Sequence, residues 1–388
     1  MLKIWLIGLL LLTNALMAKV GFDVGGQGVA YYQTDNDLNN DFFSKESSRG
    51  SLGLQIDVNA KVDNGFELGY EGTFLGTLGL ENSIIATTRQ NAQANAFNAY
   101  ATTEVFLLRR MENMNIKLGR QKLSMAYSPL AFSENWNVFE NSFEALVMTN
   151  QDIKDTTILA SYILKSNRHN DLSKFGDLGS SLEKIESGMY LVTVANKSLE
   201  NLPITASYYN LQKVAGLENG LALWLDVKSN HLPVKLAFQA GYIDPANALN
   251  QSSVFGAKAS KAYDEFALSL AYSLVSDGDF SFQNFGTKGD APFYTQMVNN
   301  QGVIALNAET IVLKTVTKLG KGDFTVQYGV TKDKSNMKND FSELDVVYKF
   351  DVLASKLFVG YIGQKREQKS FAGEDSSHNI RIWSRYTF

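Results

Sequence analysis

Apolar and polar residues alternate in short segments along most of the chain, a pattern typical of β-strands that face two different environments. The last segment, residues 379–388, shows this pattern most clearly. One of its faces carries Ile380, Ile382, Tyr386 and Phe388, with Ser384 as the exception. The opposite face is cationic, because it carries Arg381 and Arg385. A segment of this length and alternation fits a tilted strand that crosses a membrane.

Similar segments recur along the chain, and we predict eighteen strands, with sixteen as the alternative count. An even number is what single-chain bacterial β-barrels have. The predicted strands are Val20–Gln33, Ser51–Val62, Phe66–Gly76, Ala96–Leu108, Met114–Arg120, Phe143–Asn150, Thr157–Lys165, Met189–Asn196, Ile204–Lys213, Leu221–Lys228, Val234–Tyr242, Val254–Tyr263, Phe266–Val275, Thr310–Lys318, Phe324–Thr331, Ser342–Phe350, Lys356–Gly363 and Asn379–Phe388.

The gaps between these strands alternate between short and long. Residues 63–65 form a tight Asp-Asn-Gly turn, whose Asn-Gly pair suits positive φ. The gaps at 34–50, 121–142, 166–188 and 276–309 are long and polar. Short periplasmic turns and long extracellular loops are typical of outer-membrane barrels. We therefore predict an all-β fold, a single transmembrane antiparallel β-barrel over residues 19–388.

The alternation within the predicted strands separates a lipid face from a lumen. In 51–62, the residues Leu54, Ile56 and Val58 share one face, and Gln55 and Asp57 share the other. Segments 143–150, 189–196 and 204–213 alternate poorly, so their faces stay unassigned. We expect a partner subunit or an inward loop to cover them. A polar interior in a barrel of this size predicts a water-filled channel.

The N-terminus and the composition are consistent with export. Met1–Ala18 is predicted to be a signal peptide, because Lys3 precedes an apolar run that is too short to span a bilayer as a helix. Its removal leaves 35 basic residues against 40 acidic ones, which excludes the charge footprint of a nucleic-acid-binding protein. The chain has no Cys, so disulfides and thiolate metal sites are excluded.

One passage carries a family resemblance. Leu118–Gln121, Trp136 with 139–141, and the run 143–147 (Phe-Glu-Ala-Leu-Val) resemble OprD-like porins, above all the Campylobacter-type major outer membrane porins. The resemblance implies an 18-stranded homotrimeric porin whose third long loop folds inward and narrows the pore. The aromatic residues Phe132, Trp136 and Phe139 would then pack against the barrel wall instead of facing water. The alternative is that this loop covers the external mouth.

An inward third loop would bring charged residues to the constriction, where opposite charges on facing walls sort solutes by charge and dipole. The candidates from this loop and its entry are Arg120, Lys122, Glu134 and Glu140. The candidates from the wall are Asp57, Glu67, Glu71, Lys117, Arg381 and Arg385. Arg109 and Arg110 fall in a short turn and are expected on the periplasmic surface. Acidic residues in the first and seventh long loops predict mild cation selectivity that weakens with salt.

No catalytic constellation is visible, so the sequence predicts no enzyme and no cofactor. Asp35, Asp37 and Asp41 form a weak Ca²⁺ candidate in the first loop, against the alternative of a solvated acidic loop. Tyr386 and Phe388 would be the signal read by the barrel assembly machinery. The predicted function is an outer-membrane porin whose partners are lipid, ions and small hydrophilic solutes. The alternative is a scaffold whose long loops act in adhesion or surface recognition.

Overall fold

The structure, a computed structural model, describes residues 20–37, 41–90, 99–168, 171–178, 188–214, 219–229, 233–246, 249–335, 339–368 and 373–388. The predicted signal peptide and the predicted strand start at Ala96 lie outside these residues. Among the described residues, no helix is long and apolar enough to span a membrane.

Eighteen antiparallel strands in the described part of the chain form a closed barrel, which confirms the predicted fold class and strand count. The barrel strands are β1 (Gly21–Asn36), β2 (Ser48–Val62), β3 (Phe66–Gly76), β5 (Ala99–Arg110), β6 (Met114–Gln121), β7 (Phe143–Asn150), β8 (Thr156–Arg168), β10 (Gly188–Asn196), β11 (Ile204–Gln212), β12 (Asn219–Ser229), β13 (Lys235–Asp244), β14 (Ser252–Ala262), β15 (Phe266–Val275), β16 (Ala308–Leu319), β17 (Gly322–Asp333), β18 (Asp340–Val352), β19 (Ser355–Gln368) and β20 (Gly373–Thr387).

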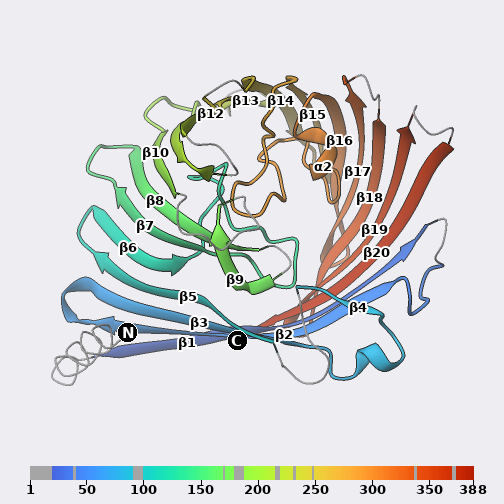
Figure 1. The fold of residues 1–388 in the computed structure, drawn as a ribbon, viewed down its shortest axis with the longest axis horizontal. Helices are drawn as coiled ribbons and strands as arrows, with labels where there is room; N and C mark the ends of the chain where they lie inside the picture. Colours follow the sequence, from blue (N-terminus) through green and yellow to red (C-terminus); the bar gives the residue numbers. More distant parts are fainter. Residues whose placement is uncertain are drawn as a thin grey trace.

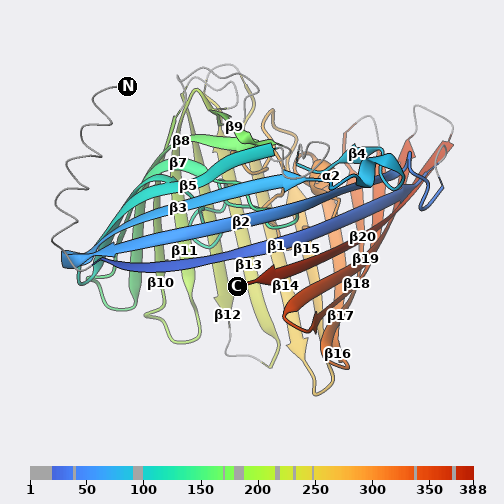
Figure 2. The same ribbon diagram turned by 90° about the horizontal axis from the view of Figure 1, so that it is seen from below.

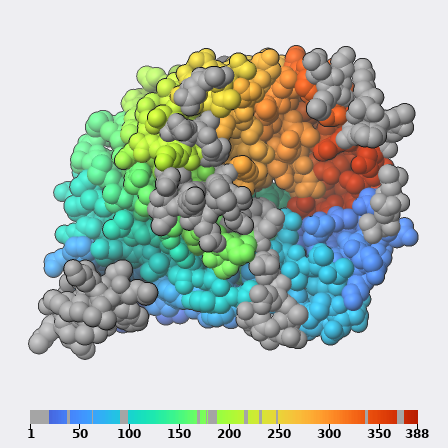
Figure 3. Space-filling view, in the orientation of Figure 1, coloured from blue at the N-terminus to red at the C-terminus, as the bar shows by residue number. Residues whose placement is uncertain are grey.

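The first and last strands close the ring. β1 and β20 pair antiparallel, from Gln27 opposite Thr387 to Asn36 opposite His378. Figure 1 shows the resulting ring, Figure 2 shows its strands from the side, and in Figure 3 the blue and red ends of the chain adjoin. The backbone of Phe388 exchanges two hydrogen bonds of 3.0 Å with Gly26. The terminal residue is therefore built into the seam of the barrel.

The short turns have the backbone geometry that their residues favour. Asp63–Gly65 is a 3-10 turn (η1) between β2 and β3, with φ of 69° at Asn64 and 75° at Gly65. Asparagine and glycine tolerate these positive values better than other residues, as the sequence predicts. The remaining elements lie within the long connections and were not predicted: η2 (Leu80–Asn82), β4 (Thr87–Thr88), β9 (Asp171–Asp177) and α2 (Gln301–Ile304).

The outer face of the barrel is apolar. Large hydrophobic side chains point outward from strand after strand, and their exposure in the isolated chain marks the surface that lipid would cover. Examples are Leu118, Leu146, Tyr190, Leu223, Leu270, Ile311 and Tyr328. Because a closed barrel leaves no unpaired edge and this one carries an apolar exterior, it is an outer-membrane barrel.

The poorly alternating strands have an apolar inner face as well as an apolar outer one. On β10, Met189 and Leu191 are buried on the inside, while Tyr190 and Val192 are exposed on the outside. The same holds for β7 and β11. The inner apolar side chains contact segments that fold into the lumen. An inward loop therefore explains the missing alternation.

Candidate functional site

Loop 122–142, between β6 and β7, lies inside the ring of strands (Figure 1). On one side, its Leu130 amide donates a 3.0 Å hydrogen bond to the hydroxyl of Tyr209 on β11. On the other side, Phe139 is buried with Tyr31 of β1 and Leu75 of β3, and its backbone forms two hydrogen bonds of 2.7 and 2.8 Å with Gln90. The loop thus reaches across the lumen, and the alternative that it covers the external mouth is wrong.

Three aromatic residues anchor this loop, as the sequence predicts. Phe132 and Phe139 are buried. Trp136 makes edge-to-face contacts with Phe358 of β19 and Trp383 of β20, at ring-centroid distances of 5.5 and 5.6 Å. Phe358 and Trp383 stack on each other at 3.8 Å. The loop therefore packs on the wall through apolar surface that would otherwise face water.

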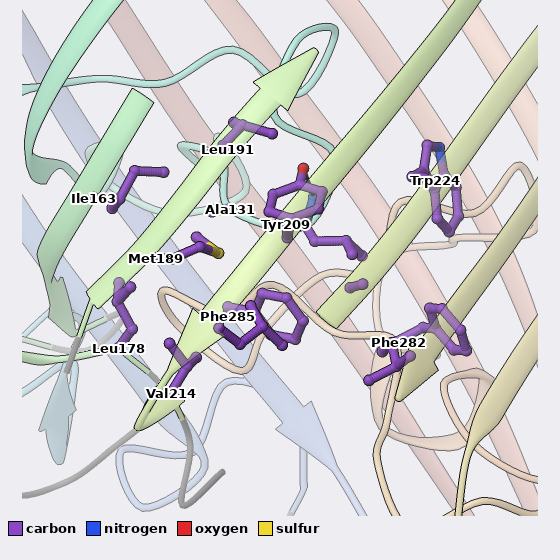
Figure 4. Packing of buried hydrophobic residues seen from close by; sticks show 14 of the residues in the cluster. Ala131, Ile163, Leu178, Met189, Leu191, Tyr209, Val214, Trp224, Phe282 and Phe285 are labelled. Atoms are coloured by element: carbon purple, nitrogen blue, oxygen red, sulfur yellow. Dashed lines mark hydrogen bonds between the residues drawn. The ribbon is translucent and has the colours of Figure 1, made fainter. Parts of the chain in front are cut away.

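A second long connection, loop 276–307 between β15 and β16, also folds into the lumen, and the sequence did not predict this. Phe282, Phe285 and Phe293 are buried in one cluster with Tyr209 and Trp224 of the wall (Figure 4). Such a concentration of phenylalanines in a polar connection is a signal that could have predicted the inward fold. The acidic charge of this loop therefore does not all lie at the external mouth.

Glu134 joins the two loops. Its side chain is 2% exposed, and its Oε1 accepts hydrogen bonds from Asn284 Nδ2 at 2.9 Å and from the Asp290 amide at 3.0 Å. The Thr287 hydroxyl donates to the same oxygen. The sequence places Glu134 among the lumen-facing residues of a constriction. That prediction is wrong, because the carboxylate is turned into the loop junction and not toward water.

The far end of loop 276–307 is attached to β18. The amides of Val298 and Asn299 donate to Asp345 at 3.3 Å and to Glu343 at 2.9 Å. Arg381 of β20 donates to the side-chain oxygen of Asn299 and is 5% exposed. Arg381 is therefore a loop anchor, which corrects its prediction as a lumen-facing charge.

The middle of loop 276–307 is attached to β13. Gln239 accepts from the Tyr294 amide at 3.1 Å and donates to the Pro292 carbonyl at 2.9 Å. The Tyr294 hydroxyl donates to Asp226 at 2.7 Å. Burial, together with this bond to a carboxylate, raises the pKa of Tyr294. The loop is thus held to both neighbouring walls.

An acidic cluster occupies the inner wall on β2, β3 and β5. Asp57 lies opposite Glu71 in the strand register, and Glu71 lies opposite Glu104. With Glu67 and Lys117 these residues line a cavity of about 250 Å³. Like charges in register repel one another, so the arrangement requires neighbouring cations.

The cations beside this cluster come from β5, β6 and loop 122–142. Lys122 Nζ lies 2.7 Å from Glu71, Lys117 lies 3.9 Å from Glu104, and Arg110 lies 3.0 Å from Glu67. Burial disfavours the charge of Lys122, but the carboxylates of Glu71 and Glu104 outweigh it and raise the Lys122 pKa. Arg110, the last residue of β5, also lines the cavity, although its side chain is 57% exposed next to the short turn, where the sequence places it.

Basic residues gather on the opposite part of the wall. The lysines of this row are Lys228, Lys258, Lys314 and Lys349, which lie on β12, β14, β16 and β18. Lys349 lies above the ring of Trp136 at 5.2 Å, and Lys258 lies above that of Tyr294 at 4.7 Å. Both inward loops therefore meet a cationic wall.

A charged cavity of about 750 Å³ lies along β16 to β20, next to the tip of loop 122–142. Glu140 and Arg385 both line it, together with Trp136, Lys349 and Lys321. Glu140 and Arg385 are two of the ten predicted constriction residues, and the structure also brings Lys122 against Glu71 in the acidic cluster. Another cavity beside the loops measures about 460 Å³ and is lined by Asp226, Lys228, Tyr127 and Tyr294.

The structure also gives the surroundings of a further constriction candidate and of the Ca²⁺ candidate. Arg120 pairs with Glu144 at 2.6 Å, lies over the ring of Phe175, and lines none of these three cavities. Asp35, in the weak Ca²⁺ candidate, pairs with Arg49 at 2.6 Å. Among the described residues, no cluster of three or more His, Cys, Asp or Glu side chains is arranged to hold a metal ion. The structure therefore gives no support to the Ca²⁺ candidate.

Comparisons with known proteins were made at the level of sequence and of structure. No family model matches the sequence, and no curated protein matches it. Solved structures do match. The crystal structure of Pseudomonas aeruginosa OccD3 (OpdP) covers 95% of this chain and 91% of its own, with a TM-score of 0.72 and 14% identity.

Two more crystal structures from Pseudomonas aeruginosa match over 95% of this chain. OpdK with vanillate is covered over 100% of its chain, with a TM-score of 0.74 and 14% identity. OccK8 (OprE) is covered over 98%, with a TM-score of 0.71 and 12% identity. At these identities the likeness concerns the fold. The chain therefore has the 18-stranded barrel fold of the Pseudomonas aeruginosa Occ outer-membrane channels.

Proposed function

We propose that this protein is an OprD-like outer-membrane porin that passes ions and small hydrophilic solutes by passive diffusion, and that it is not an enzyme. The observation that carries the proposal is the charged lining of the cavities beside the two inward loops. Acidic residues on β2, β3 and β5 and basic residues on β12 to β20 would set up a transverse field across a water-filled path.

The proposal also includes mild cation selectivity of the channel. Acidic and basic side chains around the three cavities are nearly equal in number, so the wall alone favours neither ion strongly. The first loop carries Asp35, Asp37, Asp41 and Glu46 against Lys45 and Arg49. An acidic mouth concentrates cations at low salt, and the effect fades as the Debye length shortens.

Homotrimeric assembly, the likeness to Campylobacter-type porins and insertion by the barrel assembly machinery are proposed on the sequence resemblance. Chemical cross-linking of the purified protein, followed by mass determination, tests the trimer. A monomer at every protein concentration would contradict it.

The second candidate is a scaffold that displays its loops for adhesion. One observation favours the scaffold: the two inward loops fill part of the lumen with packed apolar side chains. The charged cavities on both sides of those loops favour the channel. Liposome swelling discriminates between the two candidates.

We expect liposomes containing the purified protein to swell in an isotonic solution of a small neutral sugar, and the swelling rate to fall as the sugar becomes larger. Liposomes without protein provide the baseline. Swelling no faster than that baseline, from protein shown to be folded, would favour the scaffold.

A further inference from the structure

We propose that Glu134 is a latch that holds loops 122–142 and 276–307 together as one unit across the lumen, and thereby sets the width of the channel. This inference rests on the proposed channel function. In this role Glu134 is a positioning residue, because it acts on solutes through the loops that it joins.

The first step is the direction of the hydrogen bonds. Glu134 belongs to loop 122–142, and the donors Asn284, Thr287 and the Asp290 amide all belong to loop 276–307. Three donors from one loop converge on one buried oxygen of the other. Loss of that oxygen would remove an acceptor from the fully buried Asn284 amide and from the two half-buried donors, which favours separation of the loops.

The second step is the remaining hydrogen bonding between the two loops. The side chain of Asn284 is fully buried, and its Nδ2 donates a 2.7 Å hydrogen bond to the Phe132 carbonyl. The Phe285 amide donates to the Leu130 carbonyl at 2.8 Å. These bonds lie next to Glu134 along both loops. A change at Glu134 would therefore disturb the polar part of the junction, next to the buried apolar cluster that both loops share.

The third step is the space around the carboxylate. A Cβ atom at Gly289 would lie 2.6 Å from both carboxylate oxygens of Glu134, closer than such atoms approach. An alanine at this position would therefore have to displace the Glu134 carboxylate. Gly302, in the same loop, has nothing within 4 Å of an added Cβ. It provides a matched control.

The fourth step is the position of the junction between two cavities. The cavity of about 750 Å³ is lined by Asn135, Trp136 and Glu140, which follow Glu134 in the loop. The cavity of about 460 Å³ is lined by residues 125–127 and Pro129, which precede it, and by residues 292–294 of the other loop. Separation of the loops at Glu134 would displace the residues on either side of it that line these cavities, and would thereby widen the path.

The test uses the full-length protein with Glu134→Ala and Gly289→Ala, which remove or displace the carboxylate. The controls are Glu134→Gln, which retains an acceptor oxygen, and Gly302→Ala. We expect the two latch variants to have a larger single-channel conductance and to admit sugars that the parent excludes. Both controls should behave like the parent.

A second measurement is independent of conductance. The chain has no Cys, so a single Cys can be introduced at the buried Ala131 or Ala291, one in each loop. With Glu134→Ala we expect reaction of this Cys with a water-soluble maleimide to become roughly 10- to 100-fold faster, because the docked state loses buried hydrogen bonds. The unheated mobility of each variant on a gel shows whether its barrel is folded.

Folded latch variants with unchanged conductance, solute cut-off and labelling would overturn the latch. If the parent passes no current, the proposed channel function fails, and the labelling rates still decide whether Glu134 holds the loops together. Faster labelling with unchanged conductance would show that the junction opens but does not set the width, which also overturns the proposal.

Discussion

Glu134 and Glu140 lie in the same loop but in different surroundings. Glu134 is buried in the loop junction, whereas Glu140 lines the large cavity together with Arg385. A charge beside the water path acts on passing ions much more strongly than one enclosed by protein hydrogen bonds. We therefore expect Glu140→Gln to lower cation selectivity and Glu134→Gln to leave it nearly unchanged.

The measurement is the reversal potential in a salt gradient across a planar bilayer, at low and at high salt. The shift caused by Glu140→Gln should shrink toward ~1 M salt, where the Debye length is roughly 3 Å. An equal shift for both variants would contradict the different placement of the two carboxylates. A parent of anion-selective sign would show that the lysine row and Arg385 outweigh the acidic loops.

At the scale of single residues, the sequence predicts on which face of a strand a side chain lies, but not which other residue it contacts. Strand alternation correctly places Glu67, Glu71 and Arg385 inside the barrel. It cannot show that Arg381 is covered by Asn299, because Asn299 belongs to loop 276–307, which is distant in the sequence. Glu134 is misplaced for the same reason, because its three donors come from a loop whose inward fold was not predicted.

At the scale of elements, the last strand supplies a test of assembly. Phe388 pairs with the backbone of Gly26, and its ring stacks with that of Tyr386 at 6.0 Å. We expect deletion of Phe388, or Phe388→Asp, to lower outer-membrane insertion strongly without affecting export, so that the protein accumulates in the periplasm or is degraded. Cell fractionation measures this, with Phe388→Tyr as the control. Normal surface levels of the charged variant would contradict the assembly signal.

The alternation of turns and loops supplies a test of topology. We expect Cys introduced at Asn64 or Lys321, both exposed in short turns, to react only when the periplasm is opened. Cys at Glu46, exposed in the first loop, should react on intact cells. Labelling of all three positions from one side would contradict the orientation.

The strands could be predicted almost completely, because alternation and turn residues are local features of the chain. β3, β7 and β15 have the predicted bounds, and the other barrel strands differ by a few residues at their ends. The inner faces of β7, β10 and β11 could not be assigned from the sequence. Their inner side chains, which a loop buries, are as apolar as the outer side chains that face lipid. The short strands β4 and β9 carry no periodic signal of their own.

For the whole molecule, the central claim is that the barrel conducts despite two loops packed in its lumen. The most direct test is a single-channel recording of the purified full-length protein in a planar bilayer at neutral pH. We expect stepwise insertions, each followed by a steady current that rises linearly with voltage. Folded barrels that insert but carry no steady current would contradict the channel.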